Sequence, residues 1–133
     1  MGVRVDKYLG YVVDIQKEWG ELTIDHQDLY LCNEEKKTDT FKPYYAKGNC
    51  KDKITVLYDG MSGEYTKLIY VLDCCADTCD DDEDIVKTVN KQLESVEVPN
   101  EIRQKLRNMY KEIFNVEHVT DFKVQLEYFI HWS

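Results

Sequence analysis

The chain has 133 residues, of which 43% are apolar and 32% are charged, and its formal net charge at pH 7 is −9. This length predicts a single domain, residues 1–133, that can form a hydrophobic core without disulfides or a bound metal. The negative charge argues against direct binding to nucleic acid, because contact with a phosphate backbone requires a positively charged face.

The first residues lack the long apolar run of a signal peptide, and no apolar stretch is long enough to span a bilayer. The five cysteines are an odd number, so at least one is unpaired in any disulfide scheme. We therefore expect a cytoplasmic protein with reduced thiols and no membrane contact.

The first part of the chain is predicted to form strands. Residues 8–15 are assigned to one strand. Residues 19–32 are ambiguous, because their apolar positions fit two short strands and also an irregular helix, and we assign them to strands. These apolar positions are Leu22, Ile24, Leu29 and Leu31. His26 is interpreted as part of a surface turn.

A β-hairpin is predicted over residues 53–72. The strands 53–58 and 65–72 flank a loop that contains Gly60 and Gly63, and glycine allows the positive backbone angles of a tight reversal. The second strand is apolar at nearly every position, which favours a central strand covered on both faces.

Two helices are predicted between this hairpin and the end of the chain. The first carries an apolar stripe from Ile85 to Val96, and the acids before it can accept hydrogen bonds from its free N–H groups. The second carries a stripe from Ile102 to Phe114 and begins after Pro99. The short connection between them favours an antiparallel pair.

The last segment, residues 122–132, alternates with a period of two and predicts a long strand. On this pattern Phe129 and His131 belong to the wetter face of the strand. The elements together predict an α+β fold, with a mainly antiparallel sheet of four to six strands and a two-helix hairpin packed on one face.

Residues 73–84, here called the acidic segment, contain seven acids and no base, while the rest of the chain has 19 acids and 17 bases. Two interpretations remain open. The acids can cap the following helix and leave the surplus in solvent, or they can form a docking surface for a basic partner. The residues predicted to bind such a partner are Asp77, Asp80, Asp81, Asp82 and Glu83.

The acidic segment also contains Cys74, Cys75 and Cys79. Cys75 and Cys79 have a spacing compatible with zinc, but no second pair of ligands follows, so zinc is only a weak alternative. An EF-hand calcium loop is excluded, because the positions that require glycine and glutamate carry Ile85 and Lys91. We expect no cofactor.

Residues 41–49, here called the aromatic segment, combine aromatic residues with Lys, Pro and Gly and have no regular period. Aromatic side chains on loops are typical of protein-binding hot spots, so Phe41, Tyr44 and Tyr45 are predicted to contact a partner. The alternative is that they fold back onto the core.

The chain contains no phosphate loop, nucleophile elbow, paired metal-binding histidines or dinucleotide fingerprint. Their absence lowers the expectation of an enzyme without excluding one. The leading hypothesis is a small acidic, non-catalytic binding protein, an inhibitor or accessory factor that occupies a basic or mixed surface of a larger protein.

Two other classes stay open. One is a small thiol- or metal-dependent enzyme or zinc module that uses Cys74, Cys75 and Cys79, and the other is a structural subunit that assembles with itself. In size and acidity the chain resembles the accessory and counter-defence proteins of bacterial viruses, although no motif carries this resemblance, and a viral origin would place it in the host cytoplasm.

Overall fold

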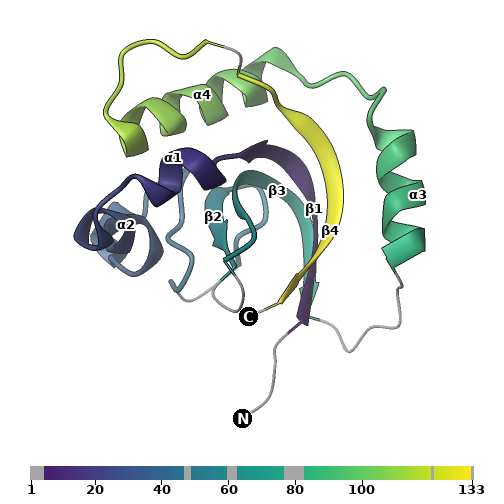
Figure 1. The fold of residues 1–133 in the computed structure, drawn as a ribbon, viewed down its shortest axis with the longest axis horizontal. Coiled ribbons are helices and arrows are strands. Elements are labelled where there is room, and N and C mark those ends of the chain that lie inside the picture. The colour runs from purple at the N-terminus through teal and green to yellow at the C-terminus, as the bar shows by residue number, and fades with distance from the viewer. Residues whose placement is uncertain (1–4, 47–48, 60–62, 77–82, 121, 133) are drawn as a thin grey trace.

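The computed structural model describes residues 5–46, 49–59, 63–76, 83–120 and 122–132 (Figure 1). These residues form four strands, four α-helices and a short 3-10 helix. In chain order they are β1 (Val5–Asp14), α1 (Gln16–Gly20), α2 (Ile24–Leu31), η1 (Glu34–Lys36), β2 (Ile54–Tyr58), β3 (Thr66–Ala76), α3 (Glu83–Leu93), α4 (Asn100–Phe114) and β4 (Gln125–Trp132).

The four strands form one antiparallel sheet in the order β2-β3-β1-β4. The predicted hairpin is present as β2 and β3, with Val56 opposite Leu68. The first strand of the chain lies in the middle of the sheet, where Tyr8 pairs with Phe129 of β4. An α+β fold with an antiparallel sheet of four strands is therefore confirmed.

The sheet is strongly curved (Figure 1). A register shift between Leu9 and Gly10 interrupts the pairing of β1 with β3, and such irregularities increase the local bend of a strand. A Cβ atom at Gly10 would lie 2.3 Å from the carbonyl oxygen of Tyr70. Glycine is therefore required where the two backbones approach at the bend.

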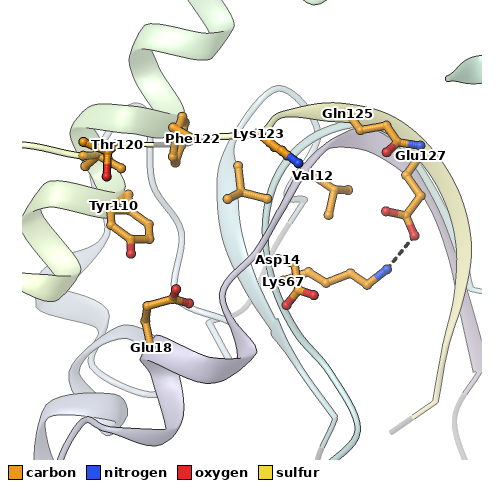
Figure 2. A pocket seen from close by; sticks show the side chains of 12 residues that line it. Val12, Asp14, Glu18, Lys67, Tyr110, Thr120, Phe122, Lys123, Gln125 and Glu127 are labelled. Atoms are coloured by element: carbon orange, nitrogen blue, oxygen red, sulfur yellow. Dashed lines mark hydrogen bonds and ion pairs between the residues drawn. The ribbon is translucent and has the colours of Figure 1, made fainter. Parts of the chain in front are cut away.

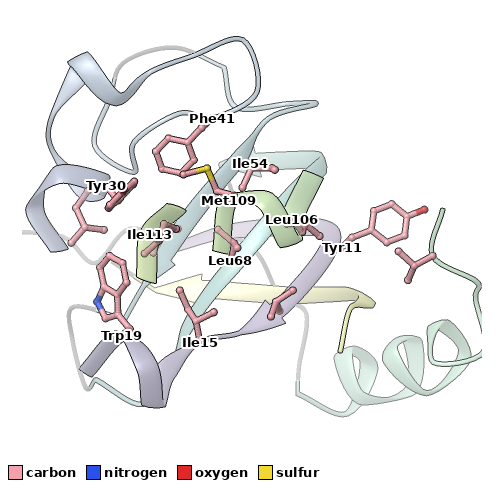
Figure 3. Packing of buried hydrophobic residues seen from close by; sticks show 14 of the residues in the cluster. Tyr11, Ile15, Trp19, Tyr30, Phe41, Ile54, Leu68, Leu106, Met109 and Ile113 are labelled. Carbon is pink, nitrogen blue, oxygen red and sulfur yellow. The ribbon is translucent and has the colours of Figure 1, made fainter. Parts of the chain in front are cut away.

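The larger core lies between the helices and one face of the sheet (Figure 3). Leu106 and Ile113 of α4 are fully buried there together with Leu68 of β3 and Trp19 of α1. The predicted apolar stripe of the second helix is confirmed, because it is this stripe that covers the sheet.

The other face of the sheet, here called the inner face, has its own apolar cluster of Val12, Leu57, Ile69, Val71 and Phe129. Tyr8, Tyr44, Cys50 and Cys74 pack against this cluster. Both faces of the central strands are thus covered, as the apolar sequence of β3 predicts.

Helix α3 lies along β4 (Figure 1). The side chain of Asn90 donates a hydrogen bond to the carbonyl oxygen of Tyr128 at 2.8 Å and accepts one from its backbone N–H at 2.7 Å. Because β4 is an edge strand, this amide takes the place of a neighbouring strand at one residue.

The prediction of strands in residues 19–32 is wrong, because the described chain there forms α1 and α2. The side chain of Thr23 accepts a hydrogen bond from the backbone N–H of His26 at 3.2 Å and so caps the first turn of α2. Both helices are short, and Tyr30 and Leu31 are the buried residues of α2. Two neighbouring buried residues cannot establish a helical period.

The last strand is also covered more completely than its alternation predicts. Phe129 is buried and His131 is fully buried, so the prediction of a wetter face is wrong for both. Strand β3 continues to Ala76, beyond the predicted end of the strand at residue 72, and so includes the first residues of the acidic segment. No helix in the described ranges is long and apolar enough to cross a membrane.

Candidate functional site

The three aromatic residues that were predicted to contact a partner differ in how far they are exposed. Phe41 is only 2% exposed and packs edge-on against Tyr30 in the larger core. Tyr44 is half-buried and points its hydroxyl at His131. Tyr45 is 59% exposed. Of the three, Tyr45 alone offers most of its side chain to a partner.

The backbone of Tyr45 is held in place by α2. Its N–H donates a hydrogen bond to the carbonyl oxygen of Leu31 at 2.8 Å, and the N–H of Ala46 bonds to Pro43 at 3.0 Å to close a turn. The ring of Tyr45 meets that of Tyr44 edge-on, with 4.6 Å between their centroids. These contacts restrict the motion of Tyr45 before binding, so less conformational entropy is lost when a partner binds.

Most of the acidic segment falls outside the described residues. This applies to the predicted partner residues Asp77, Asp80, Asp81 and Asp82 and to Cys79. Glu83 is the first residue of α3, and Cys75 lies in β3, without a description of either side chain. What the structure places is the start of the segment: Cys74 of β3 contacts Cys50, which directly follows the aromatic segment.

A polar cluster lies on the inner face around the two ring nitrogens of His131, Nδ1 and Nε2. The sequence did not predict this cluster. The hydroxyl of Tyr44 is 2.5 Å from Nε2, and the hydroxyl of Tyr65 is 2.5 Å from Nδ1. Asp6 and Asp59 are also buried and act electrostatically on this imidazole. The curvature of the sheet allows these contacts, because Tyr65 and His131 belong to opposite ends of it by register.

The cluster satisfies the hydrogen-bonding groups of a neutral imidazole. Neutral histidine has one N–H donor and one nitrogen acceptor, so one tyrosine hydroxyl accepts from the ring while the other donates to it. Burial lowers the pKa of His131 below its ordinary value of 6.5, and Lys67 lowers it further, whereas Asp6 and Asp59 raise it. Burial is the largest of these effects, so the ring is held in its neutral form.

No local signal in the sequence indicates this cluster. The two tyrosines lie 87 and 66 residues from His131 along the chain, and they reach it from a loop and from the residue before β3. Only the pairing of the strands and the fold of the aromatic segment bring them together.

A thiol pair adjoins the same face. The sulfur atoms of Cys50 and Cys74 are 3.5 Å apart, and both residues are half-buried. Burial and the contact with Cys50 raise the pKa of Cys74 to about 11. Burial also raises the pKa of the nearby Tyr8, with smaller contributions from Cys50 and Asp6. Cys74 and Tyr8 therefore stay protonated at neutral pH.

A pocket of about 380 Å³ opens where β4 separates from the end of β1 (Figure 2). Lys67 and Glu127 form an ion pair at 2.5 Å on one side of it, and Tyr110 and Phe122 lie on the other. Its lining contains no histidine or cysteine. Glu127 neutralises the charge of Lys67, and Asp14, Glu18 and Lys123 are the other charged residues that line the pocket.

No group of three or more His, Cys, Asp or Glu side chains in the described ranges could hold a metal ion. The weak zinc alternative depends on Cys75 and Cys79, whose side chains lie outside the description.

Comparison of the chain with family models, with curated proteins and with solved structures found no match. Any statement about function therefore depends on the residues and their geometry alone.

Proposed function

We propose that this chain is a small, non-catalytic binding protein that occupies a surface of a larger protein, as an inhibitor or accessory factor. In this proposal Tyr45 is the aromatic anchor of the contact, and the acidic segment attracts a partner with a basic or mixed surface. Phe41 belongs to the core and Tyr44 packs against the ring of Tyr45, and neither touches the partner in this proposal.

The observation that carries the proposal is the contrast between the backbone and the side chain of Tyr45. The backbone is hydrogen-bonded to the end of α2, while the ring is 59% exposed. A tyrosine in this state supplies a large contact area with few torsions left to order, which is why tyrosine is enriched in binding hot spots.

Charge supports the same proposal. The chain has a net charge of −9, and seven of its 26 acids lie in the acidic segment. The contact between Cys50 and Cys74 brings the end of the aromatic segment to β3, which leads into the acids. In this proposal the negative charge of the chain attracts a basic partner, which accelerates association.

Affinity capture with the tagged full-length chain tests this proposal. The chain and its Tyr45→Ala and Ile24→Ala variants are incubated with extract of the native host, and the captured protein is identified. Ile24 is a suitable control, because it is an exposed apolar residue at the other end of α2. We expect the same partner with the parent chain and with Ile24→Ala, and its loss with Tyr45→Ala.

Binding to the purified partner then separates the two contributions. Tyr45→Ala is expected to weaken the affinity by about 30-fold, as for a hot-spot residue worth about 2 kcal/mol. Changing Asp80, Asp81 and Asp82 to Asn is expected to slow association and leave dissociation unchanged. Binding that is unaffected by Tyr45→Ala but falls steeply with salt would contradict the anchor and favour mimicry of nucleic acid.

A further inference from the structure

Cys50 and Cys74 come from separate parts of the chain and meet on the inner face. Cys50 precedes β2, Cys74 lies in β3, and their sulfur atoms are 3.5 Å apart. Tyr8 and Tyr44 pack against the same apolar cluster as the two thiols. The fold therefore holds two reduced thiols in contact, although they are 24 residues apart in sequence.

This separation is close to that of a disulfide. A disulfide bond is about 2.05 Å long, so its formation requires the two sulfur atoms to approach by roughly 1.5 Å. Both residues are half-buried, so a small reagent can reach them. The third described thiol, Cys32, is exposed at the end of α2 and provides an internal comparison.

We propose that Cys50 and Cys74 form a reversible thiol–disulfide site whose oxidant is hydrogen peroxide or another small hydroperoxide. The disulfide would form when the chain reacts with peroxide, and a dithiol reductant would reduce it again. It does not depend on the proposed binding function, since it requires no partner.

The reaction balances in two steps. The thiolate sulfur of Cys50 attacks one peroxide oxygen, the O–O bond breaks, and sulfenic acid and hydroxide form, the hydroxide becoming water with the proton that Cys50 lost. The sulfur of Cys74 then attacks the sulfenic sulfur, the S–O bond breaks, and the leaving hydroxide takes the proton of Cys74 as a second water. Two thiols supply two electrons and two protons, and one peroxide becomes two waters.

The order of the two residues follows from their surroundings. Burial and the contact with Cys50 raise the pKa of Cys74 to about 11, and the proposal therefore assigns the second step to Cys74. Closure would join the residue after the aromatic segment to β3. It would thereby fix the chain next to Tyr44 and Tyr45 against the inner face.

Peptide mapping of the full-length chain tests the site. The reduced chain is treated with hydrogen peroxide, free thiols are blocked with N-ethylmaleimide, and tryptic peptides are analysed without reduction. Trypsin separates the two residues, because Lys51, Lys53 and Lys67 lie between them. We expect one dominant linked product between the peptide with Cys50 and the peptide of residues 68–87, and its disappearance after treatment with dithiothreitol.

The peptide of residues 68–87 also contains Cys75 and Cys79, so variants are needed to identify which of its cysteines is bonded to Cys50. The Cys75→Ser/Cys79→Ser double variant and the Cys32→Ser variant should form the linked product as the parent chain does, and Cys50→Ser or Cys74→Ser should abolish it. A link that disappears in the double variant, or one that mainly involves Cys32 or a second molecule, would overturn the assignment.

A comparison in denaturant keeps the test independent of any substitution. The folded parent chain should give the link between these two peptides as its main product, whereas the chain unfolded in guanidinium chloride should give a mixture of links, because only folding holds these two sulfur atoms together. The same mixture of links from the folded and the unfolded chain, or oxidation of Cys50 to sulfinic acid without a bond to Cys74, would refute the site.

Discussion

The imidazole of His131 is fully buried between the hydroxyls of Tyr44 and Tyr65. A protonated ring would need both hydroxyls as acceptors and would carry a charge away from solvent. Asp6 and Asp59 offset part of that cost, but burial is the larger effect and lowers the pKa of the ring. The residue therefore couples the stability of the inner face to pH.

The sign of this coupling follows from the two states. Well above pH 6.5 the ring is neutral in both the folded and the unfolded chain. Below it the unfolded chain binds a proton that the folded chain excludes, so the free energy of unfolding should fall as the pH falls below about 6.5. Urea unfolding at a series of pH values, from about 7.5 to about 5, measures this fall in the free energy of unfolding.

Variants isolate the contribution of His131. His131→Gln should be less stable than the parent chain and should lose much of the pH dependence in this range, whereas His118→Gln, at an exposed position, should keep it. If His131→Gln does not fold, the ring signals of the parent chain in nuclear magnetic resonance serve instead. A ring that titrates near pH 6.5 or above in the folded chain would contradict the prediction.

At the level of elements, one side chain of α3 is hydrogen-bonded directly to the backbone of β4. Asn90 makes two hydrogen bonds to the backbone of Tyr128, and both are part-buried. Their removal leaves an N–H and a C=O of an edge strand without these partners. An edge in that state is also a template for pairing with another chain.

Asn90→Ala is therefore expected to reduce the free energy of unfolding by about 1–3 kcal/mol. Asn108→Ala is the matched control, because its amide is exposed on α4 and bonds only to the neighbouring turn through Gln104 at 2.9 Å. It should cost less than about 0.5 kcal/mol. Urea unfolding gives both values, and hydrogen exchange at the amide of Tyr128 should accelerate in Asn90→Ala alone. Equal losses in the two variants would argue against this role.

For the whole molecule, charge is concentrated rather than evenly spread. The acidic segment holds seven of the acids, and the remaining chain is close to neutral. Acids of one sign repel one another in a compact chain, and salt weakens this repulsion, since the Debye length falls to about 10 Å at 0.1 M ionic strength.

Added sodium chloride should therefore stabilise the fold. We expect a gain of about 1 kcal/mol between low and near-physiological salt, equivalent to a rise of roughly 4 °C in the midpoint of thermal unfolding. The variant with Asn at positions 80, 81 and 82 should start from a higher midpoint and gain less. A midpoint that does not change with salt in the parent chain would show that the acids do not repel one another significantly in the folded state.

Some elements of this fold were predictable from the sequence and others were not. The hairpin and the stripe of α4 are found where they were predicted. The last segment is also a strand, but it begins at Gln125 and its second face is covered, which its alternation did not predict. Helices α1 and α2 have five and eight residues, too few for their pattern to separate helix from strand.

The candidate site was predictable to a smaller extent. Phe41 and Tyr45 are four residues apart in an irregular segment, and no period indicates that the first is buried and the second exposed. The alternation of β4 could not show that a loop covers its second face over His131. Long-range contacts of this kind depend on the assembled fold and leave no mark on neighbouring residues.

The strand order has a consequence for biosynthesis. β1 is made first among the four strands, yet it lies between β3 and β4, which are made later. When residues 5–120 have left the ribosome, β1 still lacks its neighbour β4. The four-stranded sheet can be completed only after residues 125–132 have also emerged. Until then the backbone of β1 is open to other partners, and a chaperone that holds this strand would favour correct assembly.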